Sequence, residues 1–460
     1  MNLSKIKSLH FVGIGGIGMS GLAKIFLEMG YHISGSDLQE NEFTRRLKNK
    51  GAIIYQGHSG RYLKNVDLVI ISSAIPPDNP EVQKARKRNI PIILRGKILS
   101  LLANENNAIV VAGTHGKTTT ASLISSILFY AGEDPTIIIG GELKEIKSNA
   151  MLGKGKYIVI ESDESDGSFL FLSPKISVLT CLEDDHLDYY GSQKKLVQAF
   201  IQFTGKLKQG GILITNNDSL RLREVVKKAS LPSSSKVITY GINSSADLTA
   251  KEIKLKEFSS SYILKYKGKI SEEIKLSLNG QHNIYNSLAA IATGLALKIR
   301  KDIIKDALLS FQGIRRRYEQ IGHTSSDILL IDDFAYHPTQ IKAVLKASQR
   351  LNRRIITIFQ PHRYTRTKLL LSELAFSFKE TDELILTQIY PAGENAIPGI
   401  DGKLLFEEIK KQRKGPTFYL PCKEEIPDFL KKRVKEGDLI ITMGAGDIRK
   451  VGEKYLAQTQ

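Results

Sequence analysis

Short apolar runs alternate with amphipathic stretches along most of the chain. In the first hundred residues the runs are LHFVGIG, HISGSD, AIIYQG, LVIISSAI and PIILR, and stretches of helical apolar spacing separate them. A second series reads AIVVAG, TIIIGG, YIVIESD, ISVLTCL and GILITNN; a third, after GIRRRYE, reads DILLIDDFA, RIITIFQP, ELILTQIY and DLIITMGAG. This is the order of strands and crossover helices that builds parallel sheets.

The pattern predicts an α/β protein of three domains, each a largely parallel sheet flanked by helices. We expect a Rossmann-like N-terminal domain over residues 1–103, a P-loop-type ATPase domain over residues 104–312, and a Rossmann-like C-terminal domain over residues 313–460. Within the second domain, residues 236–279 alternate Tyr, Ile, Lys and Ser, which favours antiparallel strands there.

Composition is that of an ordinary soluble globular protein, with 42% hydrophobic and 25% charged residues among 460. No apolar run approaches the ~18 residues that a membrane span needs. The N-terminal segment carries Lys5 and Lys7 and then glycines, unlike the apolar core of an export signal. The two cysteines, Cys181 and Cys422, form no disulfide framework or CxxC pair. We therefore expect a cytoplasmic protein without membrane contact.

The formal net charge of +18 raises the question of a nucleic-acid partner. The basic residues are dispersed as KK and RK pairs, and no stripe of interleaved aromatic residues accompanies them. We expect no nucleic-acid partner, although a field of this sign would attract small anionic substrates.

A first glycine cluster, HFVGIGGIGMSG, lies at residues 10–21. Gly13, Gly15 and Gly18 satisfy G-x-G-x-x-G between a predicted strand and helix, and Asp37 ends the next strand. Such glycines let the backbone approach phosphates at a helix N-terminus, and the carboxylate can bind a ribose. The motif alone is compatible with a dinucleotide coenzyme, with another phosphate-bearing ligand, or with tight strand-to-helix packing.

A second loop, GTHGKTTT, occupies residues 113–120. Only the distal half of the P-loop pattern is present, because Val111 stands where its first glycine would be. That half still carries the chemistry: Gly113 and Gly116 free backbone N–H groups, Lys117 reaches terminal phosphates, and Thr118 can bind Mg²⁺.

Two acid-rich segments follow apolar runs of the same predicted sheet: ESDESDGSF at residues 161–169 and EDDHLDYYGS at residues 183–192. Their carboxylates would gather at the carboxyl edge that also holds Lys117. Mg²⁺ prefers hard oxygen ligands, so we expect Glu161, with His186 from the second segment, near a bound triphosphate.

The ordered set GTHGKTTT, ESDESDGSFL, DHLDYYGS, NGQHNIYNSLAAIA, RRRYE, FQPHRYTRT and GAGDI resembles the ATP-dependent Mur ligases of peptidoglycan synthesis. With HFVGIGGIGMSG and SSAI, the chain is most similar to the alanine-adding members. The resemblance implies a three-domain carboxylate–amine ligase whose substrates are UDP-N-acetylmuramate, ATP and L-alanine, with Mg²⁺ as the metal. The reaction would pass through an acyl phosphate, so both phosphate loops would be used.

The resemblance also implies a set of site residues. Catalysis would depend on Lys117, Glu161 and His186, and the metal on Thr118, Glu161 and His186. The uridine nucleotide would lie near Gly15, Gly16, Gly18, Asp37, Ser72, Ser73 and Ala74. ATP would be bound by Gly113, Thr114, His115, Gly116, Lys117, Thr118, Thr119, His282, Asn283, Asn286, Arg317 and Asp332. The amino acid would meet Arg363, Arg366, Tyr336 and His337.

The chain departs from the family at residues 332–339, which read DDFAYHPT where alanine-adding ligases carry DDYGHHPT-like or DDYAHHPT-like segments. Phe334 and Tyr336 replace a tyrosine and the first of two histidines. A phenol can donate one hydrogen bond but carries no positive charge near neutral pH.

Alternative functions stay open at this point. A related ligase could add a different amino acid or a recycled tripeptide, and an NAD-dependent oxidoreductase would use Gly13–Gly18 but leave residues 113–120 unexplained. We expect a monomer or weak homodimer.

Overall fold

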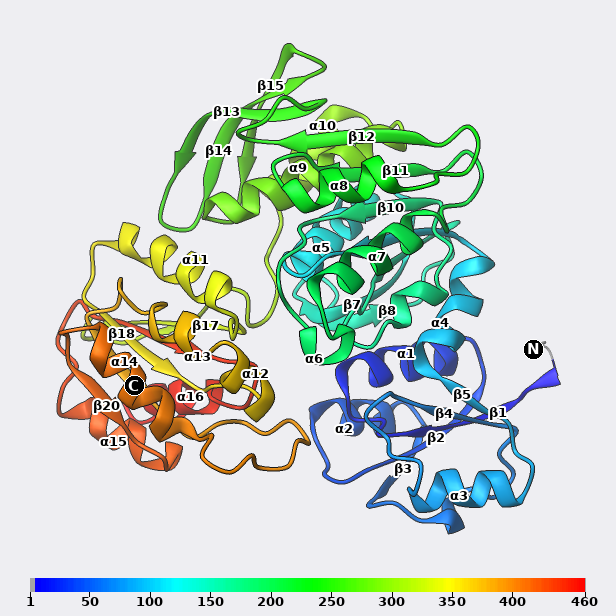
Figure 1. Cartoon of the computed structure of the whole chain (residues 1–460), viewed down its shortest axis with the longest axis horizontal. Helices are drawn as coiled ribbons and strands as arrows, with labels where there is room; N and C mark the ends of the chain where they lie inside the picture. Colours follow the sequence, from blue (N-terminus) through cyan, green and yellow to red (C-terminus); the bar gives the residue numbers. More distant parts are fainter. Residues whose placement is uncertain (1–4, 460) are drawn as a thin grey trace. The chain divides into compact units, whose positions relative to one another are not determined.

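The computed structural model describes residues 5–459 and contains three sheets (Figure 1). By contacts the chain forms two compact units: residues 1–254, 261–277 and 283–312 make the first, and residues 255–260, 278–282 and 313–460 the second. Two of the sheets belong to the first unit, and the third belongs to the second unit. The predicted α/β class with mostly parallel sheets is confirmed. No helix in the described part of the chain is long and apolar enough to cross a bilayer.

The first sheet has the strand order β3-β2-β1-β4-β5, and its neighbouring strands are all parallel. Its strands are the predicted ones: β1 (Ser8–Val12), β2 (His32–Asp37), β3 (Ile53–Gln56), β4 (Leu68–Ile71) and β5 (Ile92–Leu94). The helices are α1 (Ile17–Glu28), α2 (Glu42–Asn49), η2 (Gly60–Tyr62), α3 (Pro80–Lys87) and α4 (Arg95–Asn104). The order changes direction beside β1, so the loop from β1 to α1 lies where such sheets bind ligands.

The second sheet has ten strands in the order β15-β14-β13-β12-β11-β10-β6-β9-β7-β8. They are β6 (Asn107–Ala112), β7 (Thr136–Leu143), β8 (Ser148–Met151), β9 (Tyr157–Glu161), β10 (Ile176–Leu179), β11 (Ile212–Asn216), β12 (Lys236–Gly241), β13 (Leu248–Leu255), β14 (Ser260–Tyr266) and β15 (Lys269–Leu276). The helices are α5 (Lys117–Tyr130), η3 (Ser168–Phe171), α6 (Leu187–Tyr190), α7 (Gln193–Thr204), α8 (Leu220–Lys228), α9 (Gln281–Ala296) and α10 (Lys301–Leu309).

The expectation of antiparallel strands from residue 236 onward is wrong at its start. Strand β12 pairs in parallel with β11, and its last two residues pair in parallel with the first two of β13. Side-chain alternation reports that one face of a strand is buried, but it carries no information on the direction of the neighbouring strand. The short loop after β12 brings the start of β13 beside the end of β12, and the two strands run in the same direction.

Asp218 fixes that loop and also the helix that follows the sheet. Its carboxylate accepts the backbone N–H groups of Ile242 (2.7 Å), Asn243 (2.9 Å) and Ser244 (2.6 Å) and the hydroxyl of Tyr285 on α9 (2.7 Å). Burial alone would raise the pKa of Asp218, but these donors outweigh it and lower the pKa to about 2. The ionised carboxylate therefore stabilises both the turn and the placement of α9.

We expect the free energy of unfolding of the Asp218→Asn variant to depend less on pH in the acid range than that of the wild type. A carboxyl whose pKa is lowered on folding contributes stability that is complete above its unfolded value, and that stability is lost as pH falls through the folded value of about 2. The asparagine variant should be less stable than wild type at pH 7 and lose less stability between about pH 4 and pH 2. Thermal unfolding followed by circular dichroism across that range checks this; parallel curves for the two proteins would contradict it.

The two sheets of the first unit share one apolar core. Leu22 and Phe26 of α1 belong to the same buried cluster as Val110 and Ile160 of the second sheet. Polar contacts accompany the packing: Lys24 Nζ donates to the carbonyl of Ala150 at 2.6 Å. Helix α1 is therefore held between the first sheet and the β7–β8 hairpin.

The third sheet has the order β16-β17-β21-β18-β19-β20 and is parallel except for the pair β16–β17. Its strands are β16 (Glu319–His323), β17 (Leu329–Asp333), β18 (Ile355–Phe359), β19 (Glu383–Leu386), β20 (Thr417–Tyr419) and β21 (Leu439–Met443). The helices are α11 (Pro338–Ser348), η4 (Gln349–Leu351), α12 (Tyr364–Leu369), α13 (Leu371–Ala375), α14 (Gly402–Gln412), η5 (Lys423–Glu425), α15 (Ile426–Lys431) and α16 (Arg449–Ala457). Two apolar clusters bury the sheet, one with Ile331 and Phe359 and one with Leu330 and Ile358.

Candidate active site

The loop at residues 113–116 joins β6 to α5, and helix α5 begins at Lys117. Gly113 and Gly116 have φ of +137° and +80°, a region that side chains rarely tolerate. A Cβ on Gly113 would also lie 2.2 Å from the Thr180 hydroxyl. Only glycine fits either position, and the resulting loop leaves backbone N–H groups at the N-terminus of a 14-residue helix, where an anionic ligand is favoured.

Lys117 is held by a buried carboxylate that the motif did not single out. Its Nζ donates to Glu164 Oε1 and to the carbonyl of Gly113, each at 2.7 Å. The side chain of Glu164 is 1% exposed. Burial raises the pKa of Glu164, while the neighbouring ammonium of Lys117 acts in the opposite direction. The pair keeps the lysine folded back on its own loop.

Thr118 and Glu161 meet as the sequence predicts. The Thr118 hydroxyl donates to Glu161 Oε1 at 2.8 Å, and Glu161 Oε2 accepts the N–H of Gly140 at 2.6 Å. A hydroxyl and a carboxylate this close can serve as neighbouring ligands of one Mg²⁺, which takes oxygen donors at about 2.1 Å. The residues present therefore fit a magnesium ion.

The other predicted metal residue, His186, lies beside a different acid. Its Nε2 is 3.6 Å from Glu164 Oε1 and 3.5 Å from Asp185 Oδ2. The backbone of His186 is left-handed, with φ +57°, at the start of the short helix α6. His186 thus belongs to the Lys117–Glu164 cluster.

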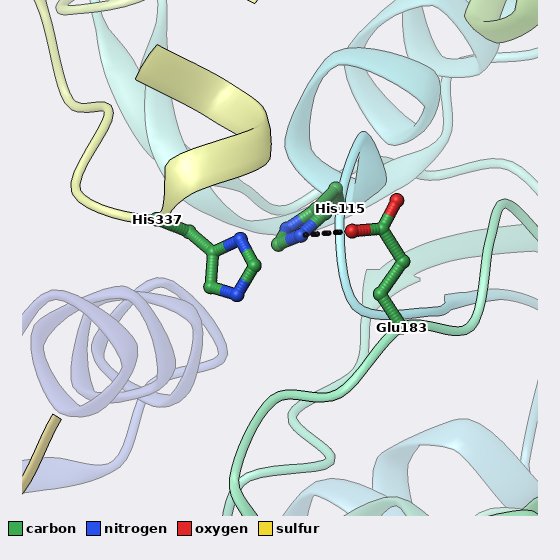
Figure 2. Close-up of side chains that lie close together, drawn as sticks. All are labelled: His115, Glu183 and His337. Atoms are coloured by element: carbon green, nitrogen blue, oxygen red, sulfur yellow. Dashed lines mark ion pairs between the residues drawn. The ribbon is translucent and has the colours of Figure 1, made fainter. Parts of the chain in front are cut away.

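A second carboxylate pairs with the loop itself. His115 Nε2 is 3.5 Å from Glu183 Oε2, and Figure 2 shows this pair. The His337 that Figure 2 also labels belongs to the second compact unit. The N–H of His115 also donates to the Cys181 sulfur at 3.2 Å. The loop is thus fixed from the strand beside it, β10, and from the acid segment after that strand.

Helix α9 contacts the loop through the predicted asparagines. A Cβ on Gly116 would lie 2.5 Å from Asn286 Oδ1, which also accepts the hydroxyl of Thr120 at 3.2 Å. Asn286 in turn donates to Asn283 Oδ1 at 3.0 Å, and His282 before them is exposed. The sequence element GQHNIYN therefore places its two asparagines against the phosphate loop.

At the first glycine loop, Asp37 contacts the backbone of the glycines. The N–H of Gly15 donates to Asp37 Oδ2 at 2.8 Å, so this carboxylate orders the loop. The predicted segment Ser72–Ala74 follows β4, the strand next to β1, and Ile75 after it packs on Gly13. Ser73 and Ala74 are exposed at this sheet edge.

In the second unit, Arg366 and Tyr336 form a stacked pair. The Arg366 guanidinium carbon lies 4.3 Å from the centre of the Tyr336 ring, and its Nη1 is 2.7 Å from His362 Nδ1. The ring of a neutral phenol attracts the cation, which a protonated histidine at this position would repel. Arg363, which precedes α12 (Tyr364–Leu369), has φ +68°, a strained conformation that is often retained at functional positions.

Arg316 and Arg317, which lie just before β16, contact the buried Asp332 and the Phe334 ring. Asp332 is fully buried and accepts from Arg316 Nε at 3.0 Å, and Arg316 also donates to the carbonyls of Gly444 and Gly446. Arg317, the predicted nucleotide contact, lies 5.2 Å over the Phe334 ring. The motifs RRRYE, DDFAYHPT and GAGDI thus meet around one buried carboxylate.

His337 makes a structural contact as a helix cap. It precedes helix α11 (Pro338–Ser348), and its Nδ1 accepts the N–H of Thr339 at 3.4 Å. Its side chain is buried. A helix cap of this kind fixes the chain direction after β17.

Sequence reasoning did not select Glu164, Arg95 or Asn149. The repeated acids of ESDESD offered a signal for Glu164, because an acid close to Lys117 can pair with its ammonium. Asn149 donates to the carbonyl of Ile17 at the start of α1 (2.6 Å), and Arg95 pairs with Asp163 (3.0 Å). These last two join separate sheets, and no local pattern marks them.

Models of three Mur ligase domains match the chain: the Mur ligase family catalytic domain over residues 8–107, the Mur ligase middle domain over residues 111–294, and the Mur ligase glutamate ligase domain over residues 316–446. The chain belongs to the Mur ligase family. The resemblance stated from the motifs is thereby confirmed.

Curated relatives match almost the whole chain. The UDP-N-acetylmuramate–L-alanine ligase of Dictyoglomus turgidum is 45% identical over 453 residues, which are 98% of this chain and 97% of the relative. The enzyme of the same name from Aquifex aeolicus is 44% identical over 456 residues, 99% and 98% of the two chains. Among solved structures, UDP-N-acetylmuramate-alanine ligase MurC from Thermotoga maritima matches with a TM-score of 0.85 at 28% identity, covering 98% of this chain and 99% of that one. A murein peptide ligase from Psychrobacter arcticus matches with a TM-score of 0.74 at 25% identity, covering 98% of each chain.

Proposed function

We propose that this chain is an ATP-dependent ligase that joins L-alanine to the lactyl carboxylate of UDP-N-acetylmuramate, giving ADP and phosphate. The observation that carries the proposal is the identity of 45% over 98% of the chain to a ligase named for this reaction. The lysine loop supports it, because activation of a carboxylate by ATP needs a cation at the transferring phosphate. An NAD-dependent oxidoreductase would leave that loop without a role.

The reaction proceeds in two displacements. A lactyl carboxylate oxygen attacks the γ-phosphorus of ATP, the bond to the β–γ bridging oxygen breaks, and ADP leaves. The alanine nitrogen then attacks the acyl carbon of the acyl phosphate, loses a proton, and phosphate leaves with the bonding electrons. Water must be kept from the acyl phosphate, since its hydrolysis would waste the ATP.

In this proposal the central loop binds the triphosphate. Residues 113–119 supply backbone N–H groups and the Lys117 ammonium, and Asn283, Asn286 and His282 lie on the adenosine side. Bound Mg²⁺, held by Thr118 and Glu161, would neutralise charge on the phosphates. His186 stays a proposed catalytic residue on the basis of its contact with the Lys117–Glu164 cluster. Arg317 and Asp332 are proposed nucleotide contacts of the C-terminal domain.

The other two domains bind the remaining substrates. Gly15, Gly16, Gly18, Asp37 and the segment Ser72–Ala74 are proposed to hold the uridine nucleotide, and Arg363, Arg366, Tyr336 and His337 the amino acid. The proposed division at residues 103 and 312 is supported by one sheet in each range. We further propose a cytoplasmic monomer or weak homodimer, which size-exclusion chromatography with light scattering would test.

Phosphate release tests the function directly. We expect release only when UDP-N-acetylmuramate, ATP, Mg²⁺ and an amine are all present, with L-alanine giving the highest kcat/KM among alanine, glycine, serine and the tripeptide L-alanyl-γ-D-glutamyl-meso-diaminopimelate. Preference for the tripeptide would favour a murein peptide ligase, the name given to the Psychrobacter arcticus match. Absence of phosphate release with every amine would overturn the proposal.

Replacing Arg366 with alanine is expected to raise the KM for L-alanine about 30-fold and the KM for ATP less than about 3-fold. The guanidinium is the group best placed to clamp the amino-acid carboxylate, because Tyr336 and His362 hold it in one orientation. Lys368→Ala is the control, since Lys368 is an exposed cation on the same helix. Equal increases in both KM values would contradict carboxylate binding.

A further inference from the structure

Arg95 opens helix α4, directly after the last strand of the first sheet. Its side chain is 18% exposed. A Cβ built on Gly18 would lie 2.7 Å from Arg95 Nη1, so the guanidinium packs on the third glycine of the first loop. The absence of a side chain at Gly18 is what admits the cation there.

The other edge of the guanidinium is paired with an acid from the second sheet. Arg95 Nη2 donates to Asp163 Oδ2 at 3.0 Å. Asp163 Oδ1 accepts the N–H and the hydroxyl of Ser165, at 3.0 and 2.6 Å, so the carboxylate is fixed on the side away from Arg95. The ion pair therefore has a defined orientation.

The backbone segments that carry Arg95 and Asp163 are closely packed against each other. A Cβ on Gly96 would lie 2.5 Å from Ser168 Cβ, so α4 packs closely on the turn that follows the acid segment. Ser168 Oγ donates back to the carbonyl of Asp163 at 3.2 Å. The backbone of Arg95 thus cannot move far from that of Asp163, and only the guanidinium end is adjustable.

Asp163 is followed in the chain by Glu164, the partner of Lys117 at 2.7 Å. A continuous path of charged groups therefore runs from the first glycine loop through Arg95 and the acid segment to the lysine of the second loop. All of these residues lie in the first compact unit.

We propose that Arg95 is a substrate-positioning residue: one edge of its guanidinium binds the diphosphate of the UDP-sugar at the first glycine loop, while the other edge, through Asp163, fixes that substrate relative to Lys117. This inference rests on the proposed function. A planar guanidinium can bind two anions on different edges, because it has five donors in a fixed fork. A lysine ammonium cannot reproduce that arrangement.

The first test compares Arg95→Ala with Arg86→Ala. Arg86 is an exposed arginine of α3, a helix in the same domain as the first sheet. Arg95→Ala should raise the Kd for UDP-N-acetylmuramate, measured by calorimetry, about 30-fold and change the Kd for a non-hydrolysable ATP analogue less than about 3-fold. Arg95→Lys should recover only part of the UDP-sugar affinity. Arg86→Ala should match wild type in both constants.

The second test separates positioning from folding. Asp163→Asn leaves the cation in place, so UDP-sugar affinity should stay within about 3-fold of wild type while kcat falls about 10-fold. Adding Asp163→Asn to Arg95→Ala should cause no further loss, because the path is already broken. A full additional loss in the double variant, or an Arg95→Ala variant indistinguishable from Arg86→Ala, would overturn the inference.

Failure of the inference and failure of the proposed function give different results. If the function is wrong, wild-type protein releases no phosphate from UDP-N-acetylmuramate, ATP and L-alanine. If only the role of Arg95 is wrong, the wild type turns over and Arg95→Ala binds UDP-N-acetylmuramate as tightly as the wild type does.

Discussion

Replacing Lys117 with alanine is expected to lower kcat for phosphate release about 10³-fold, the scale of loss for a pre-placed group that stabilises charge in a transition state. Lys117 is the first residue of α5 and sits on a loop whose two left-handed glycines fix its backbone. Its ammonium contacts Glu164, and the γ-phosphate of ATP would compete for the same charge. Rates at saturating substrate concentrations, measured by phosphate release, check this.

Folding and catalysis must be separated in this experiment, because the replacement also removes the ammonium that pairs with the buried Glu164 carboxyl. Adding Glu164→Gln to the Lys117→Ala variant should restore most of the melting temperature but none of the rate. Lys156→Ala, which removes an exposed lysine of the same sheet, should change neither. Near-normal turnover of Lys117→Ala would contradict the assignment of the ATP loop.

The central strands of the parallel sheets could be predicted because they are buried on both faces and therefore read as continuous apolar runs. Strand β4, LVII, and strand β18, IITIF, are examples. Strands β8 (SNAM), β16 (EQIGH) and β20 (TFY) were missed, because they are short or polar and lie at sheet edges. An edge strand has only one strand neighbour, and its sequence is correspondingly less constrained.

The phosphate loop and the acids beside it were predictable for a related reason. Parallel strands bring their carboxyl ends to one edge, so a motif placed after a strand can be assigned to that edge without knowledge of the tertiary structure. Glu161 is the last residue of β9 and meets Thr118 as expected. Three residues further on, the chain has left the strand, and its course depends on packing. That is why the partnership of Glu164 with Lys117 did not follow from the spacing of the acids.

Adjacent residues of the same type further limit what can be predicted from the sequence. RRRYE presents three consecutive arginines, and their roles depend on backbone angles that the sequence does not determine. Arg316 adopts φ +62° and reaches the buried Asp332, and both Arg316 and Arg317 lie over the Phe334 ring. Phe334 and Tyr336, the two departures from the family pattern, each lie beneath an arginine. At position 336 the phenol ring offers the cation a neutral aromatic face where the family's histidine can carry a charge, and at position 334 phenylalanine keeps the aromatic face of the tyrosine that it replaces.

Replacing Glu161 with glutamine is expected to lower kcat about 10²-fold and to raise the Mg²⁺ concentration for half-maximal turnover at least about 10-fold. Glutamine is nearly isosteric, so its side-chain carbonyl can still accept one of the two protein hydrogen bonds, from Gly140 N–H or Thr118 Oγ1. What it loses is the negative charge and one of the two oxygens that a hard cation requires. Phosphate release measured over a series of MgCl₂ concentrations reports both effects.

A control for this variant is Glu105→Gln, which neutralises an exposed acid after α4 and should leave the magnesium response unchanged. Thr118→Val tests the other proposed ligand: it removes the hydroxyl, keeps the shape, and should also shift the magnesium requirement upward. If Glu161 served only to orient the Thr118 hydroxyl, Glu161→Gln would reduce kcat at every MgCl₂ concentration by the same factor, with no change in the half-maximal value. A shift in the half-maximal MgCl₂ concentration for both variants therefore assigns the two oxygens to one ion. An unshifted concentration for both would contradict a magnesium site at Thr118 and Glu161.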